Sequence, residues 1–104
     1  MNFLVALQPE ALPLIDRLKL KKRNGTHPFS VFENETHRLV ISGIGRIQAA
    51  AATGFLLGQQ DGRPKAIINL GIAGHGSLDV GTAFLANRIF HSQEKGIYYP
   101  PAVL

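Results

Sequence analysis

The stretch K-A-I-I-N-L-G-I-A-G-H-G-S, from Lys65 to Ser77, decides the fold that the sequence predicts. Its first part, Ala66 to Leu70, is almost wholly apolar, which is typical of a strand buried on both faces of a parallel sheet. We therefore expect this strand to be central. Gly71, Gly74 and Gly76 follow it, where the chain leaves the strand. Because ligands of open α/β sheets bind outside the carboxyl ends of the strands, the sequence predicts a binding loop here, the alternative being a turn without a ligand.

The composition is that of one small globular domain. The chain has 104 residues, of which 45% are hydrophobic, and it has no cysteine. Disulfides, thiol nucleophiles and thiolate metal sites are therefore excluded. The first residues lack the basic region and cleavage site of a signal peptide, and no apolar run approaches the roughly 18 residues of a membrane span. We predict a cytoplasmic protein with no membrane partner.

The net charge of +4 comes from one segment. The chain has eleven lysine and arginine residues, and four of them lie in the segment from Lys19 to Arg23. The other seven balance the seven acidic residues. A cluster of this kind at the end of a predicted helix complements the helix dipole and is typical of a solvated terminus. No aromatic residues are interleaved with it to stack on bases, and we therefore predict no nucleic-acid partner.

Apolar strands alternate with amphipathic or alanine-rich helices along the chain, which indicates an α/β fold. The second and third strands are separated by a short polar turn and should form a hairpin. The small side chains of the second helix should let it pack closely against the sheet. From residue 91 onward no period is clear. We expect strands at Asn2–Leu7, Phe29–Phe32, Arg38–Ser42, Ala66–Leu70 and Thr82–Phe90, and helices at Pro9–Leu20 and Ile47–Gln60.

Two features at the carboxyl edge of the predicted sheet carry chemistry. Glu10 follows the first strand and opens the first helix, where its alternative role is to stabilise the helix N-terminus. The turn Gly43-Ile44-Gly45 precedes the second helix, whose first amide groups are ready to bind anions or oxygen-rich ligands. A dinucleotide fingerprint requires glycine at the position of Gln48, so the sequence disfavours a Rossmann site.

The four histidines lack the spacing of metal ligands, and we predict no metal and no cofactor. His75 alone is near the predicted binding loop. We interpret it as an exposed loop residue rather than a catalytic one.

Four motifs occur in a defined order, and together they resemble the nucleoside phosphorylase and nucleosidase superfamily. Within it the likeness is greatest to the methylthioadenosine/S-adenosylhomocysteine nucleosidases and the futalosine hydrolases. The resemblance implies a phosphorylase/hydrolase-like three-layer α/β fold with a central mixed sheet flanked by helices, apparently truncated, in which residues 1–104 are the N-terminal part of a single domain. The motifs are A-L-Q-P-E-A at Ala6–Ala11, S-G-I-G-R at Ser42–Arg46, I-N-L-G-I-A-G at Ile68–Gly74 and L-D-V-G-T at Leu78–Thr82.

The resemblance also implies a role for each matching residue. Glu10 falls where the nucleosidases carry the glutamate that orients and deprotonates the attacking water. Residues on the glycine turn fall beside the ribose and the water, and those on the loop after Leu70 fall beside the base and the nucleophile. The implied substrate-binding residues are Ile44, Gly45, Ile72, Ala73 and Gly74.

Water is the expected nucleophile. The phosphorylases usually have an arginine where this chain has Asn69 and a hydroxyl residue where it has Ile72, so phosphate would lose a cation and a hydrogen-bond donor. Arg46 is the candidate cation that could replace the missing arginine and contact phosphate or another anion. Phosphorolysis therefore stays open as the alternative. The family's ribose-binding Met-Glu pair and the acid that protonates the base lie in a second half that this chain does not contain.

We therefore predict a nucleoside N-ribosyl hydrolase whose first 104 residues alone are inactive. The alternatives are a phosphorylase of the same superfamily and a non-catalytic module that binds nucleosides or assembles. Part of a sheet exposes an open edge and an uncovered apolar face, which favour pairing, so we also expect a homo-oligomer, a dimer or larger.

Overall fold

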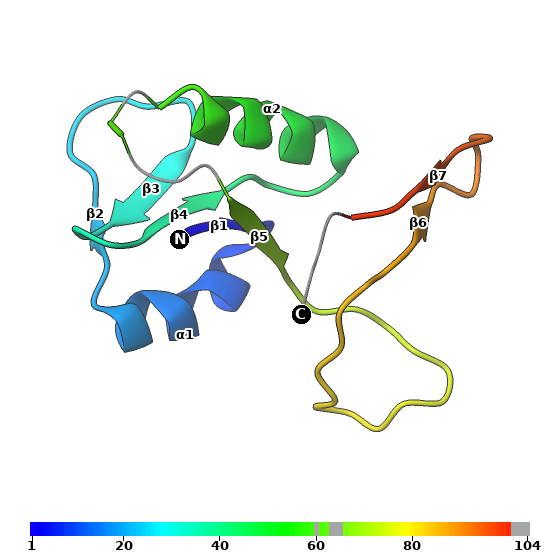
Figure 1. The fold of residues 1–104 in the computed structure, drawn as a ribbon. Helices are drawn as coiled ribbons and strands as arrows, with labels where there is room; N and C mark the ends of the chain where they lie inside the picture. The colour runs from blue at the N-terminus through cyan, green and yellow to red at the C-terminus, as the bar shows by residue number, and fades with distance from the viewer. Residues whose placement is uncertain (60, 63–65, 101–104) are drawn as a thin grey trace. The chain divides into compact units, whose positions relative to one another are not determined.

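The computed structural model describes residues 1–59, 61–62 and 66–100. The chain divides into two compact units, Met1–Ala73 and Gly74–Leu104. The first unit is a small α/β domain with a mixed five-stranded sheet, of strand order β2-β3-β4-β1-β5, and two helices (Figure 1). Its elements are β1 (Asn2–Val5), α1 (Gln8–Leu18), β2 (Lys21–Lys22), β3 (Ser30–Glu33), β4 (Arg38–Ile41), α2 (Arg46–Leu57) and β5 (Ile67–Leu70).

The strand β1 lies between β4 and β5 and runs parallel to both. Val5 at its end is in register with Ile41 and with Leu70, so three strands finish at one edge of the sheet. The strands β3 and β4 form the predicted antiparallel hairpin, and β2 pairs antiparallel with β3. The predicted α/β class and the mixed sheet are confirmed.

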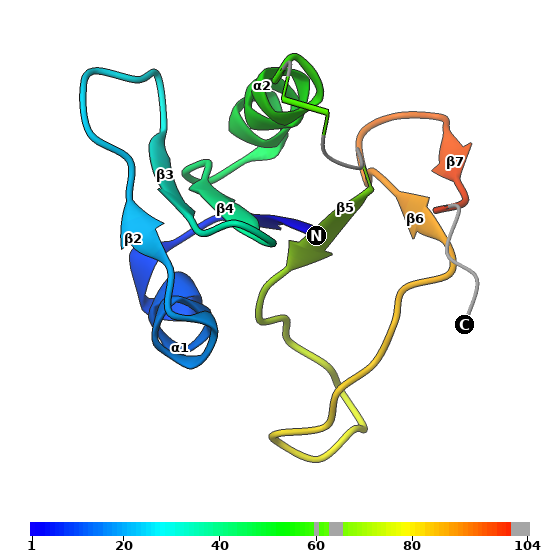
Figure 2. The same cartoon turned by 60° about the vertical axis from the view of Figure 1, so that its left-hand side comes forward.

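The helices α1 and α2 cover opposite faces of the sheet, as both views show (Figures 1 and 2). Successive side chains of a strand point to opposite faces, so β1 contributes to both cores. Leu4 packs in a buried cluster with Ala52 and Leu56 of α2, and Val5 packs in another with Ala11 of α1. The predicted flanking of the sheet by helices is therefore confirmed.

The helix α1 ends at Leu18, before the predicted Leu20. Lys19 adopts the left-handed conformation, with φ of 57°, and the Leu20 N–H donates to the carbonyl oxygen of Ile15 at 3.0 Å. This is the hydrogen bond of a Schellman turn, which commonly ends helices. Leu20 then joins the same apolar cluster as Ile15. The apolar periodicity of the helix extends to Leu20 because Leu20 is buried. However, Leu20 reaches the core through the turn at Lys19 and not as part of the helix.

The prediction that the basic cluster lies at the end of a helix is wrong for most of its residues. Lys21 and Lys22 form β2, an exposed strand at one edge of the sheet. Arg23 follows, and its Nη2 donates to Glu33 Oε1 at 2.9 Å. Lysines on an edge strand hinder pairing with another chain, so this edge is protected.

The prediction that the strand after Lys65 is central is also wrong. β5 lies at the other edge of the sheet, with β1 as its partner in the described part of the chain. Ile68 and Leu70 are exposed, whereas Ile67 packs against the cluster under α2. An apolar run indicates a preference for a sheet but does not give the number of neighbouring strands. Lys65 itself lies outside the described residues.

The helix α2 begins at Arg46, one residue before the predicted start, and its last residue is Leu57. Gly58 follows as the C-cap, and its N–H donates to the Gly54 carbonyl at 3.0 Å. The predicted end, Gln60, lies outside the described residues. The buried residues of the helix are Ala52 and Leu56, so only one side of it faces the sheet.

The second unit contains a short antiparallel pair, β6 (Ile89–Phe90) and β7 (Ile97–Tyr98). The predicted strand from Thr82 to Phe90 is therefore wrong over most of its length. The Thr82 N–H donates to the Asp79 carbonyl at 3.1 Å, which places Thr82 in a turn. The apolar residues from 83 to 86 form no strand ladder, because no neighbouring strand is available to them among the described residues.

Candidate active site at the carboxyl edge of the sheet

Three loops that follow parallel strands adjoin one another at the carboxyl edge. The Ser42 N–H donates to the Val5 carbonyl at 2.8 Å, and the Gly43 N–H donates to the Ala6 carbonyl at 3.0 Å. These bonds join the loop after β4 to the loop after β1. The side chain of Glu10 joins the first turn of α1 to the loop after β5, because its Oε1 accepts the Ile72 N–H at 3.1 Å. The predicted residues Glu10, Ile44, Gly45, Arg46, Ile72 and Ala73 thus lie on adjoining segments.

The carboxylate of Glu10 is held at both oxygens. Oε2 accepts the N–H of Leu7, the extended residue before α1, at 3.1 Å, and Oε1 accepts that of Ile72. Gly71 permits this arrangement, since a Cβ there would lie 3.3 Å from Glu10 Oε1. Each carboxylate oxygen has two lone pairs. Each oxygen therefore keeps one acceptor position for a further donor, such as a water molecule.

The position of Glu10 also fits the alternative structural role. It is the third residue of α1, where a carboxylate interacts favourably with the helix dipole and satisfies an otherwise unpaired N–H. The bond to Ile72 goes further, because it reaches a loop 62 residues away. Local capping predicts the contact with Leu7, but sequence gives no signal for the contact with Ile72.

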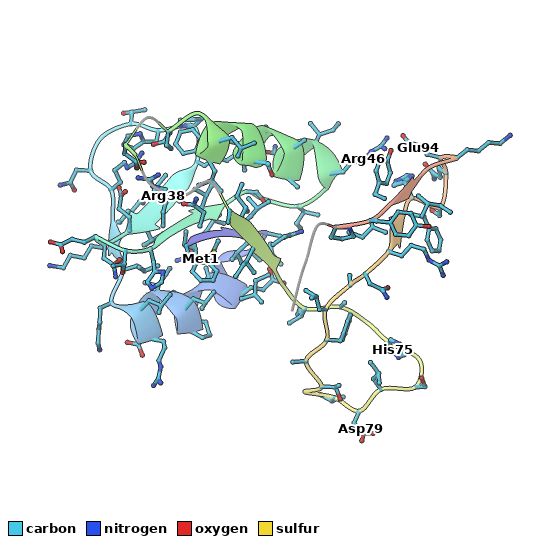
Figure 3. All side chains as sticks on the ribbon, in the orientation of Figure 1. Met1, Arg38, Arg46, His75, Asp79 and Glu94 are labelled. Atoms are coloured by element: carbon cyan, nitrogen blue, oxygen red, sulfur yellow. The ribbon has the colours of Figure 1, made fainter. Side chains whose placement is uncertain are left out.

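The turn before α2 depends on its glycines. Gly43 and Gly45 have φ of 88° and 97°, conformations that other residues rarely adopt. In the described part of the chain, no side chain caps α2 and its first turn has no acidic residue. Arg46, the first residue of the helix, is exposed at this end (Figure 3). The start of α2 is therefore suited to an anionic or oxygen-rich ligand.

The apolar side chains predicted to contact substrate are open to solvent. Ile44 is 75% exposed and Ile72 is 87% exposed. Ile72 lies directly beside Glu10 through its backbone, whereas Gly74 begins the second unit and has no established place in this geometry. Ser42, which the sequence did not single out, is buried, and its hydroxyl donates to the Gly43 carbonyl at 2.8 Å. This bond stabilises the turn before α2.

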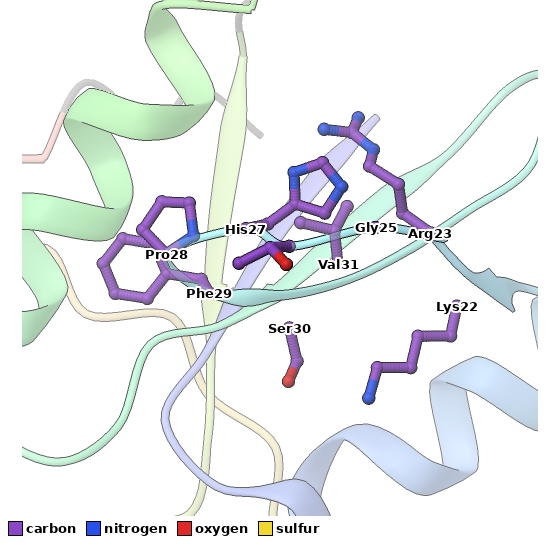
Figure 4. Close-up of a pocket in the computed structure, with 9 residues that line it drawn as sticks. Lys22, Arg23, Gly25, His27, Pro28, Phe29, Ser30 and Val31 are labelled. Atoms are coloured by element: carbon purple, nitrogen blue, oxygen red, sulfur yellow. The ribbon is translucent and has the colours of Figure 1, made fainter.

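Two surface hollows of the first unit lie elsewhere. One, of about 370 Å³, adjoins the connection between β2 and β3, and another, of about 490 Å³, adjoins the end of α1. Arg23 lines the first hollow (Figure 4). Its guanidinium already donates to Glu33 and Gln59. None of the predicted site residues lines either hollow. The candidate site is thus the open edge around Glu10.

A charged network that the sequence did not reveal lies at the amino ends of β1 and β4, opposite the carboxyl ends where Glu10 lies. Arg38, only 4% exposed, contacts Glu33 and Asp61, and Arg23 also pairs with Glu33. The hydrogen bond from Arg23 is the main cause that lowers the pKa of Glu33, and the same bond raises the pKa of Arg23. Arg38 begins β4, beside Asn2 of β1, so this network holds the amino ends of the strands.

The residues that the structure describes contain no group of three or more His, Cys, Asp or Glu side chains arranged to hold a metal ion. None of the helices among them is long and apolar enough to cross a membrane. His75 is an exposed loop residue, as predicted. Its Nδ1 accepts the N–H groups of Ser77 and Leu78 at 3.1 and 3.0 Å, so it organises its own loop.

Comparisons with models of protein families, with curated proteins and with solved structures found no significant match to this chain. Membership of the nucleosidase superfamily therefore rests on the four sequence motifs and stays a proposal.

Proposed function

We propose that this chain is the N-terminal part of a nucleoside N-ribosyl hydrolase of the nucleoside phosphorylase and nucleosidase superfamily. The observation that carries the proposal is the carboxylate of Glu10, which stands at the carboxyl ends of parallel strands and is fixed by two backbone N–H groups. A general base must lie within hydrogen-bond reach of the proton that it takes, so a fixed carboxylate with unused lone pairs is suited to the task.

Hydrolysis of an N-ribosidic bond requires a general base and a general acid. As the bond to the leaving nucleobase breaks, positive charge develops on the sugar and negative charge on the nucleobase. In the proposed step, Glu10 takes a proton from water while the water oxygen bonds to the anomeric carbon. The electron pair of the broken bond goes to the leaving base, which takes a proton from an acid. That acid belongs to the second half of the family domain.

The neighbouring loops supply contacts for the substrate. The start of α2 offers backbone N–H groups to ribose oxygens. Ile44 and Ile72 offer apolar surface. Both isoleucines are exposed, so the remaining part of the domain has to complete the pocket. This supports the proposal that residues 1–104 alone are inactive. We further propose that the active protein is a cytoplasmic homo-oligomer.

Phosphorolysis is the alternative, and Arg46 is the observation that favours it. Its exposed position at the start of α2 brings a cation to the edge that carries Glu10. However, Asn69 and Ile72 replace the arginine and hydroxyl residue that the phosphorylases use. Phosphate would therefore have fewer contacts here than in those enzymes. A module that binds nucleosides without cleaving them is the third possibility.

The test is a nucleoside cleavage assay with the full-length protein that contains residues 1–104, with and without inorganic phosphate. We expect purine nucleosides to yield free base and ribose in the absence of phosphate. A requirement for phosphate and the appearance of ribose 1-phosphate would establish phosphorolysis instead. Nucleoside binding without cleavage by the longer protein would leave only the binding module.

A further inference from the structure

The connection between β2 and β3 contains an asparagine followed directly by a glycine. Asn24 and Gly25 are both exposed. In the described part of the chain, the side chain of Asn24 forms no hydrogen bond, so its carboxamide can rotate. Gly25 has φ of 93° and no side chain that would shield its backbone nitrogen. A free carboxamide and an unhindered amide nitrogen therefore lie next to each other.

His27 lies on the same connection (Figure 4) and contacts the peptide group that joins these two residues. Its Nε2 is 2.9 Å from the carbonyl oxygen of Asn24. A carbonyl oxygen can only accept a hydrogen bond, so Nε2 carries the proton and donates it. This bond draws electron density from the amide, and the Gly25 N–H therefore loses its proton more readily. Lys22 and Arg23, which directly precede Asn24, add positive charge that favours the resulting anion.

We propose that Asn24 is a site of self-modification, at which the Gly25 nitrogen attacks the side chain and His27 promotes the attack. The Gly25 nitrogen gives its proton to water or hydroxide and bonds to Cγ of Asn24. The bond from Cγ to Nδ2 breaks, Nδ2 takes a proton from the solvent, and ammonia leaves a cyclic succinimide behind. Water then opens the ring at either of its carbonyl groups, which gives aspartate or isoaspartate.

Either product changes the connection between β2 and β3. A carboxylate replaces a neutral side chain directly after Arg23, whose guanidinium pairs with Glu33. In isoaspartate the main chain also passes through the former side chain, which lengthens the connection by a methylene group. The modification therefore alters the charge beside the network at Glu33. It does not depend on the proposed nucleosidase activity, since it uses residues that do not contact Glu10.

Asn34, in the turn between β3 and β4, lacks the features that the reaction requires. Its Oδ1 accepts the N–H groups of Thr36 and His37 at 2.9 and 2.8 Å, and its Nδ2 donates to the Leu18 carbonyl at 2.8 Å. Glu35 rather than a glycine follows it. Attack on this side chain has to break these hydrogen bonds and avoid the side chain of Glu35. Asn34 is therefore an internal control.

Peptide mapping by mass spectrometry tests the proposal, with the 104-residue chain incubated at neutral pH and each asparagine followed over time. We expect Asn24 to convert at least about ten-fold faster than Asn34, because attack on Asn34 has to break its hydrogen bonds. The products at position 24 should include both aspartate and isoaspartate. An Asn24 that stays intact, or one that converts no faster than Asn34, overturns the proposal. This comparison uses the wild-type chain, so it holds even where a variant does not fold.

His27→Ala tests whether the fold promotes the reaction. Loss of the hydrogen bond to the Asn24 carbonyl should slow the conversion about two- to ten-fold. Thr26→Ala, at an exposed neighbouring position, is the matched control and should keep the wild-type rate. In concentrated urea, wild type and His27→Ala should convert at the same rate, because the bond exists only in the folded chain. Equal rates of these two proteins in the folded state, or a difference that is equally large in urea, would contradict the role of His27.

Discussion

The helices α1 and α2 have 11 and 12 residues and cover opposite faces of one sheet, yet they differ at their starts and on their outer sides. α1 has Glu10 in its first turn and Arg17 in its last, both favourable for the helix dipole. Its exposed side includes Asp16 and Arg17. α2 has neither an acid at its start nor a base at its end, and beyond Arg46 and Gln48 its exposed residues have no polar side chain.

This difference indicates how the two helices are used. The charges at the two ends of α1 favour the helix by themselves. α2 instead has no side-chain cap at its start, which lies at the carboxyl ends of the strands, as Glu10 does. In the proposed function this start contacts the substrate, and Glu10 connects α1 to the same place.

The largest expected change in unfolding free energy distinguishes the side of α2 that faces the sheet from the side that faces away from it. Leu56 is fully buried and Leu57 is its exposed neighbour. We expect Leu56→Ala to lower the free energy of unfolding by about 2 to 5 kcal/mol, since it leaves a cavity in the core. Leu57→Ala should cost less than about 0.5 kcal/mol in the monomer. Urea unfolding of both variants measures the difference, and equal losses would mean that the side facing away from the sheet is packed within the same chain.

The next effect concerns the charged network around Glu33. Arg23, which follows β2, donates to Gln59 after α2 and also pairs with Glu33. Glu33→Gln removes the charge that Arg23 and Arg38 share, so we expect a loss of about 1.5 to 3 kcal/mol in unfolding free energy. Exposed Glu35→Gln is the control and should be nearly neutral.

Acid should weaken the same network. The pKa of Glu33 is lowered from 4.5 in the folded protein, so its contribution to stability is complete above the unfolded pKa and is lost as the pH falls through the folded pKa. Unfolding free energy should therefore decrease below about pH 4.5, and Glu33→Gln should flatten that decrease. A pH profile that the substitution leaves unchanged would assign the acid sensitivity to other carboxylates.

The smallest effects should distinguish the glycine before α2 from the glycine within it. Gly45 has φ of 97° and ψ of 161°, which is nearly restricted to glycine, so Gly45→Ala should cost about 1 to 3 kcal/mol. Gly54 lies inside the helix with open space at its Cβ position, so Gly54→Ala should stabilise the monomer by about 0.5 to 1 kcal/mol. Thermal unfolding at low protein concentration measures both, and opposite signs are the expected result.

The sequence predicts most of the first unit because its signals are local. Two strand-forming runs separated by a short polar turn indicate the hairpin of β3 and β4, and Gly43 and Gly45 mark the turn before α2. The position of Glu10 after a strand is enough to place it at the carboxyl edge. These predictions require only neighbouring residues, whose preferences are visible along the chain.

Contacts between distant segments escape the sequence. The edge position of β5 depends on which strands pair with it, and the apolar run from Ile67 contains no information on that number. The bond from Ile72 to Glu10 joins residues 62 positions apart, and buried Arg38 pairs with Asp61, 23 positions away. For the same reason, Thr82 to Phe90 has the composition of a strand but forms only the two residues of β6.

The role of Glu10 as general base is the central claim, and Glu10→Gln in the longer protein tests it most directly. Glutamine keeps one acceptor for the N–H groups of Leu7 and Ile72, so the stability loss should be about 1 kcal/mol. Loss of a general base should lower kcat by about 10² to 10⁴, or about 3 to 5 kcal/mol of transition-state stabilisation, with KM much less affected. Glu35→Gln should keep the full rate. A folded Glu10→Gln protein that hydrolyses nucleosides at close to the original rate would contradict the account.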